Sequence, residues 1–173
     1  VLYGPTGTGK THFAKQLLAD ECLDYDIATA TPTWTPGDIT GNIQPAVDEG
    51  EVTYHREAGG VSRGIQRVEQ YNDPWGVLLD EITRADISQV FGPLYTAVED
   101  DSQVIFRDDA GRELSLTDDV KIVCTMNMSD RTVNELDDAI TRRFAMIELS
   151  EYDGESREQL YRKWMASAPV FPV

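Results

Sequence analysis

Short runs of apolar residues alternate along this chain with longer segments in which apolar residues recur at helical spacing. The short runs predict buried strands over residues 1–3, 25–30, 76–79, 120–124 and 145–149. The longer segments predict helices over residues 11–20, 61–70, 87–99, 134–142 and 153–167. In the first helix we expect four apolar residues to face inward: Phe13, Ala14, Leu17 and Leu18. Apolar strands that alternate with helices are typical of a parallel sheet covered on both faces, so the pattern predicts an α/β fold.

Two stretches depart from this alternation. Residues 31–60 are rich in Thr, Pro and Gly, which predicts an irregular insert containing a short helix and a hairpin. Residues 104–107 and 113–116 flank the sequence DDAG, a turn signal, so a second hairpin is expected there.

Length and charge narrow the class of protein. A chain of 173 residues suits a single domain, and no apolar run approaches the roughly 20 residues needed to cross a bilayer. The formal net charge of −16 argues against a broad nucleic-acid-binding surface, because such surfaces are basic. Two cysteines, Cys22 and Cys124, are expected to be reduced thiols, which together with the apolar profile predicts a cytoplasmic protein without membrane contact.

A glycine-rich loop follows the first strand and matches the pattern G-x-x-x-x-G-K-[ST]. Backbone N–H groups in such a loop point at phosphate oxygens, and the following helix directs its positive dipole end at the anion. The lysine reaches the β- and γ-phosphates, and the Thr hydroxyl binds Mg²⁺. The strand before the loop and the helix after it disfavour the alternative, a glycine turn that binds nothing. The predicted nucleotide-binding residues are Gly4, Pro5, Thr6, Gly7, Thr8, Gly9, Lys10 and Thr11, with His12 beside them but in no catalytic role.

Two carboxylates, Asp80 and Glu81, end the apolar strand that runs through residues 77–79. In an open parallel sheet, ligands bind at the carboxyl ends of the strands. Asp80 is therefore predicted to hold Mg²⁺ with Thr11, and Glu81 to orient and polarise the attacking water. The alternative is that acids follow a strand simply because the chain meets solvent there.

Asn127 ends the next apolar strand and is expected to emerge beside the two carboxylates. Its amide can hydrogen-bond both a γ-phosphate and the lytic water, although an Asn at this place also suits a turn cap. Arg142 and Arg143 end a helix. The residues alone leave two readings open for them: interaction with the helix dipole, or stabilisation of charge on a transferring γ-phosphoryl group.

These motifs, in this order and spacing, resemble those of the AAA+ ATPases. The loop resembles Walker A, Asp80 and Glu81 resemble Walker B, Asn127 resembles sensor 1, and Arg142 with Arg143 resembles the arginine finger. The resemblance implies a three-layer αβα sandwich with a five-stranded parallel sheet of order 5-1-4-3-2. It also implies nucleotide bound between subunits of a homo-oligomeric ring, usually a hexamer, with Arg143 and Arg142 acting on the neighbour's nucleotide.

Finer matches resemble the McrB-type motor subunits of modification-dependent restriction systems, within the dynein-related and MoxR-like branch. The sequence DEITRADISQVFG, from Asp80, resembles the family's DEINRANLSKVFG, with Thr83 where the branch usually has Asn. The sequence MNMSDRT resembles the signature MNxxDRS and supplies Asp130 and Arg131. The sequence LDDAITRRF continues the match, and the hairpin before the sensor strand fits the same branch.

The resemblance implies an NTPase that hydrolyses ATP or GTP with Mg²⁺ and drives a DNA motor, with a nuclease partner subunit and DNA contacted through other domains. A MoxR-like chaperone that remodels protein complexes is the alternative, and the intact Glu81 argues against a third reading, a ring that does not hydrolyse. Residues 1–173 are expected to be one AAA+ core, truncated at both ends and without the C-terminal helical lid. Such a segment alone is expected to bind nucleotide weakly.

Overall fold

The computed structural model describes residues 1–48, 50–127 and 138–151. In this part of the chain a five-stranded parallel sheet has the order β2-β5-β8-β1-β9. Its strands are β1 (Leu2–Gly4), β2 (Asp24–Thr29), β5 (Trp75–Asp80), β8 (Val120–Asn127) and β9 (Ile147–Glu148). Numbered in chain order and read from β9, this is the order 5-1-4-3-2, so the predicted topology is confirmed.

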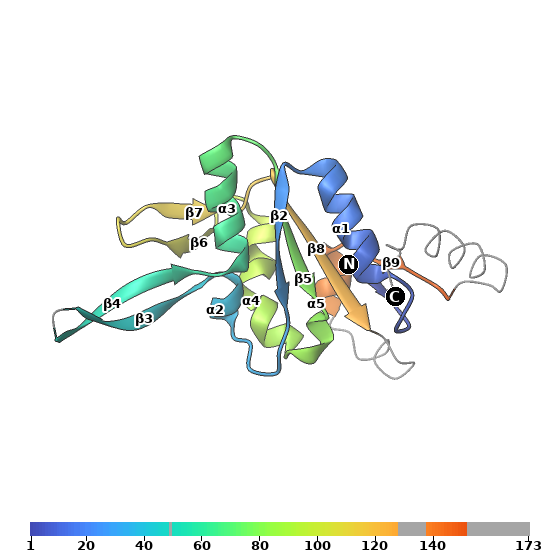
Figure 1. Ribbon diagram of the computed structural model, residues 1–173, viewed down its shortest axis with the longest axis horizontal. Helices are drawn as coiled ribbons and strands as arrows, with labels where there is room; N and C mark the ends of the chain where they lie inside the picture. The colour runs from blue at the N-terminus through green and yellow to red at the C-terminus, as the bar shows by residue number, and fades with distance from the viewer. Residues whose placement is uncertain (49, 128–137, 152–173) are drawn as a thin grey trace, which may run out of the picture.

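Helices cover both faces of this sheet, which makes three layers (Figure 1). They are α1 (Lys10–Glu21), α2 (Pro36–Ile39), α3 (Gly60–Tyr71), α4 (Ile87–Glu99) and α5 (Asp138–Arg143), with a 3₁₀ turn η1 (Ile82–Arg84). Side chains of β5 alternate between the faces: Leu78 packs with α1, whereas Val77 and Leu79 pack with α3 and α4. This period of two explains why a strand buried on both faces is apolar throughout.

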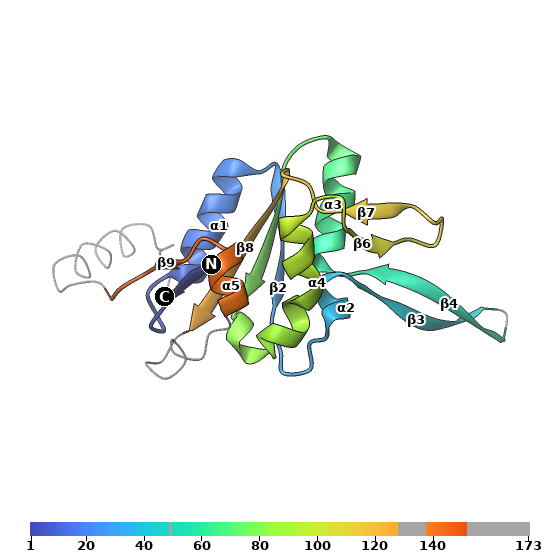
Figure 2. The same cartoon turned by 180° about the vertical axis from the view of Figure 1, so that it is seen from behind.

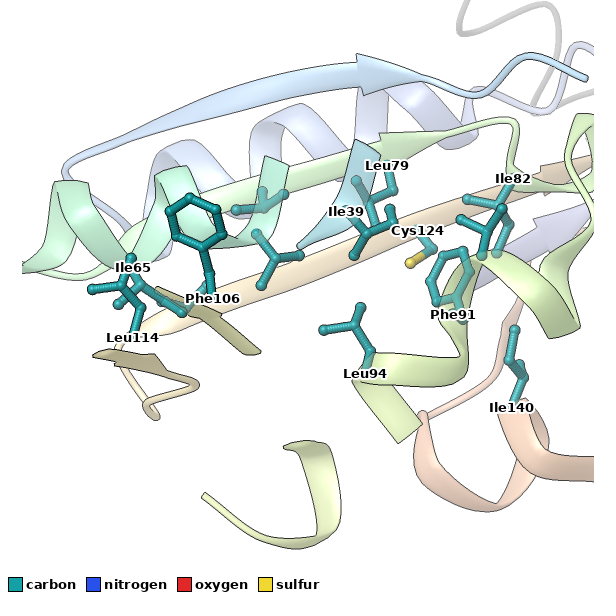
Figure 3. Packing of buried hydrophobic residues seen from close by; sticks show 14 of the residues in the cluster. Ile39, Ile65, Leu79, Ile82, Phe91, Leu94, Phe106, Leu114, Cys124 and Ile140 are labelled. Carbon is teal, nitrogen blue, oxygen red and sulfur yellow. The ribbon is translucent and has the colours of Figure 1, made fainter. Parts of the chain in front are cut away.

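The larger cluster of buried side chains lies under α3 and α4 (Figure 3). Phe91 and Leu94 of α4 meet Leu79, Ile82 and Cys124 there, all of them fully or almost fully buried. Cys22 and Cys124 are both free thiols, and burial raises the pKa of Cys124 to about 12. None of the helices in the described residues is long and apolar enough to span a membrane.

The prediction for the inward face of α1 is half wrong. Ala14 and Leu18 are buried against Leu78, but Phe13 is 45% exposed and Leu17 36% exposed. Successive residues point about 100° apart around a helix, so only one narrow stripe of α1 meets the sheet. Apolar residues at neighbouring positions did not indicate which stripe that would be.

Two antiparallel hairpins extend from the sheet's body, as predicted (Figure 1). The longer pairs β3 (Gly41–Asp48) with β4 (Glu51–Ala58), and the short helix α2 precedes it. The shorter pairs β6 (Val104–Arg107) with β7 (Glu113–Ser115) and is anchored in the core by Phe106 and Leu114. Seen from behind, both hairpins lie on the same side of the sheet's body, away from β9 (Figure 2).

Strand β8 is longer than the apolar run that predicted it. The apolar run over 120–124 is the first part of β8, which continues through Thr125 to Asn127 and pairs with β1 there, so the expectation that Asn127 ends this strand is confirmed. The described part of the helix predicted over 134–142 is α5. The helix predicted over 153–167 and the signature residues Asp130 and Arg131 lie outside the described residues.

Candidate active site

The carboxyl ends of β5, β8 and β1 meet at one edge of the sheet. These three strands are neighbours, with Gly4 paired to Asn127 and Leu79 paired to Cys124. The glycine-rich loop leaves β1, Asp80 and Glu81 leave β5, and Asn127 ends β8. Strand order therefore brings together three motifs that lie as far apart in the sequence as Gly4 and Asn127.

The loop is closed around the ammonium group of Lys10. Lys10 Nζ donates to Gly4 O at 3.0 Å, to Pro5 O at 2.6 Å and to Thr8 Oγ1 at 3.4 Å. The side chain is buried, and this burial lowers the pKa of Lys10, while the charges of Asp80 and Glu81 act in the opposite direction. The loop thus holds a positive charge at its centre, beside two carboxylates.

Glycine is required at two points of the loop for different reasons. Gly9 has φ +84° and is the N-cap of α1, a left-handed conformation that few residues with a side chain adopt. Gly4 has φ +143°, and a Cβ on it would overlap Leu149 O of the neighbouring segment. The sharp turn out of β1 therefore depends on both backbone freedom and lack of a side chain.

Asp80 is joined to the start of α1 by a hydrogen bond. Thr11 Oγ1 donates to Asp80 Oδ1 at 2.8 Å, which brings a hydroxyl and a carboxylate oxygen together. Such hard oxygen ligands suit Mg²⁺, which binds through one or two carboxylates and completes its shell with water and substrate phosphates. Within the described ranges no group of three or more His, Cys, Asp or Glu forms a complete metal cage. The residues present thus fit a magnesium ion held jointly with a phosphate.

Glu81 lies between two partners. Asn127 Nδ2 donates to Glu81 Oε1 at 3.1 Å, and the guanidinium of Arg84 approaches Glu81 Oε2 at 2.5 Å. The Glu81 backbone is left-handed, with φ +55°, a conformation that is uncommon for a residue with a side chain. The predicted sensor amide and the predicted catalytic carboxylate are therefore in direct contact.

One hollow of about 230 Å³ is shared by the motifs. Its lining residues are Thr6, Gly7, Gly9, Lys10, Thr11, His12, Glu81 and Asn127. His12 is an exposed member of this lining. Asp80 does not line the hollow but accepts a hydrogen bond from Thr11, which does. A cationic loop facing a carboxylate and an amide across an open hollow can hold a phosphate chain and activate a water molecule at its end.

Comparison with known proteins gives the family. The family model for the AAA domain of the dynein-related subfamily matches residues 1–144. The chain belongs to this family. Membership implies nucleotide hydrolysis in general, consistent with the geometry of the hollow.

Two individual proteins are similar to this AAA domain. The EcoKMcrB subunit of a type IV methyl-directed restriction enzyme from Escherichia coli K12 is 26% identical over 162 residues, which cover 86% of this chain and 34% of that protein. A crystal structure from Cytophaga hutchinsonii, of a protein named as a candidate ATPase, has a TM-score of 0.56 at 19% identity. That match covers 96% of this chain and 46% of the other, and it bears on the fold alone. The chain thus spans about a third of the curated relative's length.

The two predicted arginine-finger residues, Arg142 and Arg143, are not among the residues that line the hollow. Arg143 Nε donates to Tyr95 O at 3.0 Å, and Arg143 Nη2 forms an ion pair with Glu99 Oε1 at 2.7 Å. The guanidinium of Arg143 also lies over the Tyr95 ring, 5.2 Å from the ring centre. Arg143 is thereby attached to α4 of its own chain, whereas Arg142 is exposed. Their action on a neighbouring subunit stays a prediction, and Arg142 is the more accessible of the two.

Sequence reasoning missed two residues of this site, Thr125 and Arg84. Arg84 stands in η1, three residues after Glu81, and reaches its carboxylate. Thr125 is 1% exposed and its hydroxyl contacts both Asp80 and Glu81. A single polar residue inside the run IVCTM, two positions before Asn127, was the available signal, because a buried hydroxyl needs hydrogen-bond partners.

Proposed function

We propose that this AAA domain binds ATP or GTP with Mg²⁺ and hydrolyses the bond between the β- and γ-phosphates. The observation that carries the proposal is the shared hollow, in which the Walker-type loop faces Glu81 and Asn127 while Asp80 is bonded to Thr11. The family match supports the coarser part, a nucleotide hydrolase. ATP and GTP remain joint candidates because no described contact reads a base.

The residues have separate tasks in this scheme. Loop N–H groups and Lys10 bind the phosphate oxygens, while Thr11 and Asp80 would hold the metal ion. Bound Mg²⁺ would supply charge neutralisation at the β- and γ-phosphate oxygens. Glu81 orients a water molecule and accepts its proton as the water oxygen bonds to the γ-phosphorus. The bond from the γ-phosphorus to the bridging oxygen breaks, and the products are nucleoside diphosphate and phosphate.

Asn127 and Arg84 set the direction of the Glu81 carboxylate. Each now bonds one of its two oxygens, so a lytic water would share or replace one of these contacts. Asn127 also lines the hollow and can donate to a γ-phosphate oxygen while still touching Glu81. This arrangement would couple the presence of a γ-phosphate to the orientation of the catalytic carboxylate.

The site is expected to be completed by a second copy of the domain in a ring, usually a hexamer. A guanidinium from the neighbour would stabilise the charge on the transferring group, and such fingers contribute about 10³–10⁵ in rate in other phosphoryl-transfer enzymes. Arg142 is exposed and Arg143 contacts Tyr95 and Glu99 on α4, and both are candidates for this role.

The biological role we propose is a DNA motor for a nuclease partner subunit, as the likeness to the EcoKMcrB subunit suggests. The net charge of −16 means that DNA would be contacted through other domains or the partner. The alternative is a MoxR-like chaperone that remodels protein complexes. Exposed apolar residues on the β3–β4 hairpin favour that alternative, since they suit a protein surface better than a phosphate backbone.

Phosphate release by the full-length protein tests the hydrolytic assignment. Glu81→Gln is expected to lower hydrolysis of ATP or GTP by about 10²–10⁴ while nucleotide still binds, because only the proton acceptor is lost. Glu51→Gln on the exposed strand β4 makes the same chemical change away from the site and is expected to leave the rate unchanged. Wild-type turnover by Glu81→Gln would refute the role of Glu81.

Adding DNA separates the two biological roles. A restriction motor is expected to be stimulated by methylated DNA more than by the same unmethylated sequence when its nuclease partner is present. A rate that ignores both DNAs and rises with a protein substrate would favour the chaperone.

A further inference from the structure

Thr125 is a buried polar residue in the middle of the sheet. It lies on β8, 1% exposed, two residues before Asn127 and one residue beyond the last β5–β8 backbone pair, Leu79 with Cys124. On its other side, its backbone pairs with Leu2 of β1. Its hydroxyl is therefore level with the point where β5 gives way to Asp80 and Glu81.

The hydroxyl uses its hydrogen-bonding capacity on these two acids. Thr125 Oγ1 donates to Asp80 Oδ1 at 2.5 Å and accepts from the backbone N–H of Glu81 at 2.9 Å. A hydroxyl has one proton to donate, so the donor is committed to the Asp80 carboxylate. One side chain thus links the predicted metal ligand to the backbone of the predicted catalytic residue.

The bond to Glu81 fixes an unusual backbone conformation. Glu81 has φ +55° and ψ +45°, and the ladder between β5 and β8 has already ended, so the hydroxyl stands where a backbone acceptor would continue the sheet. The left-handed turn at Glu81 directs its carboxylate to Asn127 and Arg84. Strained backbone of this kind persists where the surroundings hold it, and here the Thr125 hydroxyl is such a holder.

The bond to Asp80 is independent of the phosphate loop. Asp80 Oδ1 accepts from Thr11 on the loop side and from Thr125 on the sheet side. The Thr125 bond comes from a rigid strand and is directed from behind the carboxylate. It can therefore keep Asp80 aimed at the loop whatever the Thr11 hydroxyl binds.

We infer that Thr125 is a positioning residue for hydrolysis, whose hydroxyl holds the Asp80 carboxylate and the Glu81 backbone in their working orientation. The inference rests on the proposed function for its kinetic consequence, but not for its structural one. Thr125 is not among the residues that line the hollow, so it would act through Asp80 and Glu81.

Paired variants separate the hydroxyl from the bulk of the side chain. Thr125→Val keeps the shape and removes the hydroxyl, and Thr125→Ser keeps the hydroxyl and removes the methyl group. Ser62→Ala is the matched control, because Ser62 is also fully buried, donates to Thr40 O at 2.5 Å and is not among the residues that line the hollow. In the full-length protein, Thr125→Val is expected to lower kcat about 10–100-fold with KM changed less than about threefold. Thr125→Ser and Ser62→Ala are expected to stay within about threefold of wild type in both constants.

Amide hydrogen exchange supplies a readout that does not depend on catalysis. Without nucleotide, the Glu81 N–H is expected to exchange at least about tenfold faster in Thr125→Val than in wild type or Thr125→Ser, because its acceptor is gone. If Thr125→Val does not fold, Thr125→Ala removes the same acceptor and carries the same expectation.

Either of two results would overturn the inference. One is a Glu81 amide exchange rate in Thr125→Val equal to that of wild type, and the other is a loss of kcat in Thr125→Ser as large as that in Thr125→Val. If wild type hydrolyses no nucleotide but the exchange difference is present, the proposed function fails while the positioning role of the hydroxyl stands.

Discussion

The carboxyl edge of the sheet and the β3–β4 hairpin place their side chains in opposite ways. At the edge, polar groups are buried and bonded to one another, as Lys10 is to the loop and Thr125 is to Asp80. On the hairpin, apolar groups are exposed: Val47 is 76% exposed and Tyr54 is 70% exposed. In the first region, buried hydrogen bonds fix the orientation of the site's side chains. In the second region, apolar side chains are exposed to solvent.

Strand register shows that the exposed apolar residues share one face of the hairpin. Val47 lies opposite Val52, Pro45 opposite Tyr54, and Ile43 opposite Arg56, so these six point the same way. Apart from Ala46, the other face carries polar residues such as Gln44, Thr53 and His55. A two-sided ribbon of this kind holds together by its backbone ladder, so its apolar face contributes little to the stability of the domain.

The largest expected stability change is in the core below the edge. Phe91→Ala removes a fully buried ring that packs edge-on to Phe144, and it is expected to lower the free energy of unfolding by about 3–5 kcal/mol. Phe13→Ala, at a 45% exposed position, is the control and is expected to cost much less. Urea unfolding measures both, and equal losses would mean that the buried cluster does not carry the fold.

Alanine substitutions at two glycines of positive φ compare the stability cost at the carboxyl edge of the sheet with that in the β3–β4 hairpin. Gly4→Ala meets Leu149 O and a strained φ of +143°, so it is expected to cost about 1–3 kcal/mol for strain, with the clash in addition. Gly50→Ala, at φ +87° in the hairpin turn, has no atom within 4 Å of the new Cβ. It is expected to cost only the strain, about 1 kcal/mol. A Gly50→Ala loss as large as that of Gly4→Ala would contradict the open surroundings of the hairpin turn.

Alanine substitutions at a buried and an exposed valine compare what apolar side chains contribute to stability in the sheet and in the hairpin. Val77→Ala, 1% exposed in β5, is expected to cost about 1.5–3 kcal/mol, because it removes contacts on the α3 side of the sheet. Val47→Ala, 76% exposed in β3, is expected to change stability by less than about 0.5 kcal/mol. If thermal unfolding shows a large loss for Val47→Ala, the hairpin face is covered in solution, and analytical ultracentrifugation would then identify self-association.

Alkylation of the two cysteine thiols measures unfolding of the parallel sheet and its helices, and does not measure changes in the β3–β4 hairpin. Burial raises the pKa of Cys124 to about 12, so below that pH the folded protein holds it as an unreactive thiol. Cys22 is partly exposed, and burial raises its pKa too. We expect iodoacetamide at pH 8 to alkylate Cys22 slowly and Cys124 only on unfolding, and Val47→Ala to leave this pattern unchanged. Mass spectrometry of the two peptides checks it, and rapid labelling of native Cys124 would contradict the packing around β8.

Much of the fold and site was predictable because local signals and topology agree. Apolar runs identify the strands, and the carboxyl-edge rule then brings Lys10, Asp80 and Asn127 together. The inward stripe of α1 was not predictable, since the larger apolar residue Phe13 is exposed while its small neighbour Ala14 is buried. The role of Thr125 was missed because a lone Thr looks like a break in an apolar run, and its hydrogen-bond partner Asp80 lies 45 residues earlier.

The hairpin gives the opposite lesson. The composition of residues 31–60 predicted a hairpin, but only the strand register shows its apolar face, and neither says what covers that face. The roles of Asp130 and Arg131 and the action of Arg142 and Arg143 on a neighbour stay predictions for a related reason. They depend on segments or subunits beyond the described residues of one chain.

Equilibrium titration of the full-length protein with a fluorescent ATP analogue, with and without Mg²⁺, tests the central claim most directly. Lys10→Ala is the test variant, and Lys121→Ala, which removes an exposed lysine on β8, is its control. We predict binding that Mg²⁺ strengthens, that Lys10→Ala weakens at least about tenfold, and that Lys121→Ala leaves unchanged, since only Lys10 lies in the phosphate loop. Binding of equal strength in Lys10→Ala and wild type would contradict the assignment of this edge as a nucleotide site.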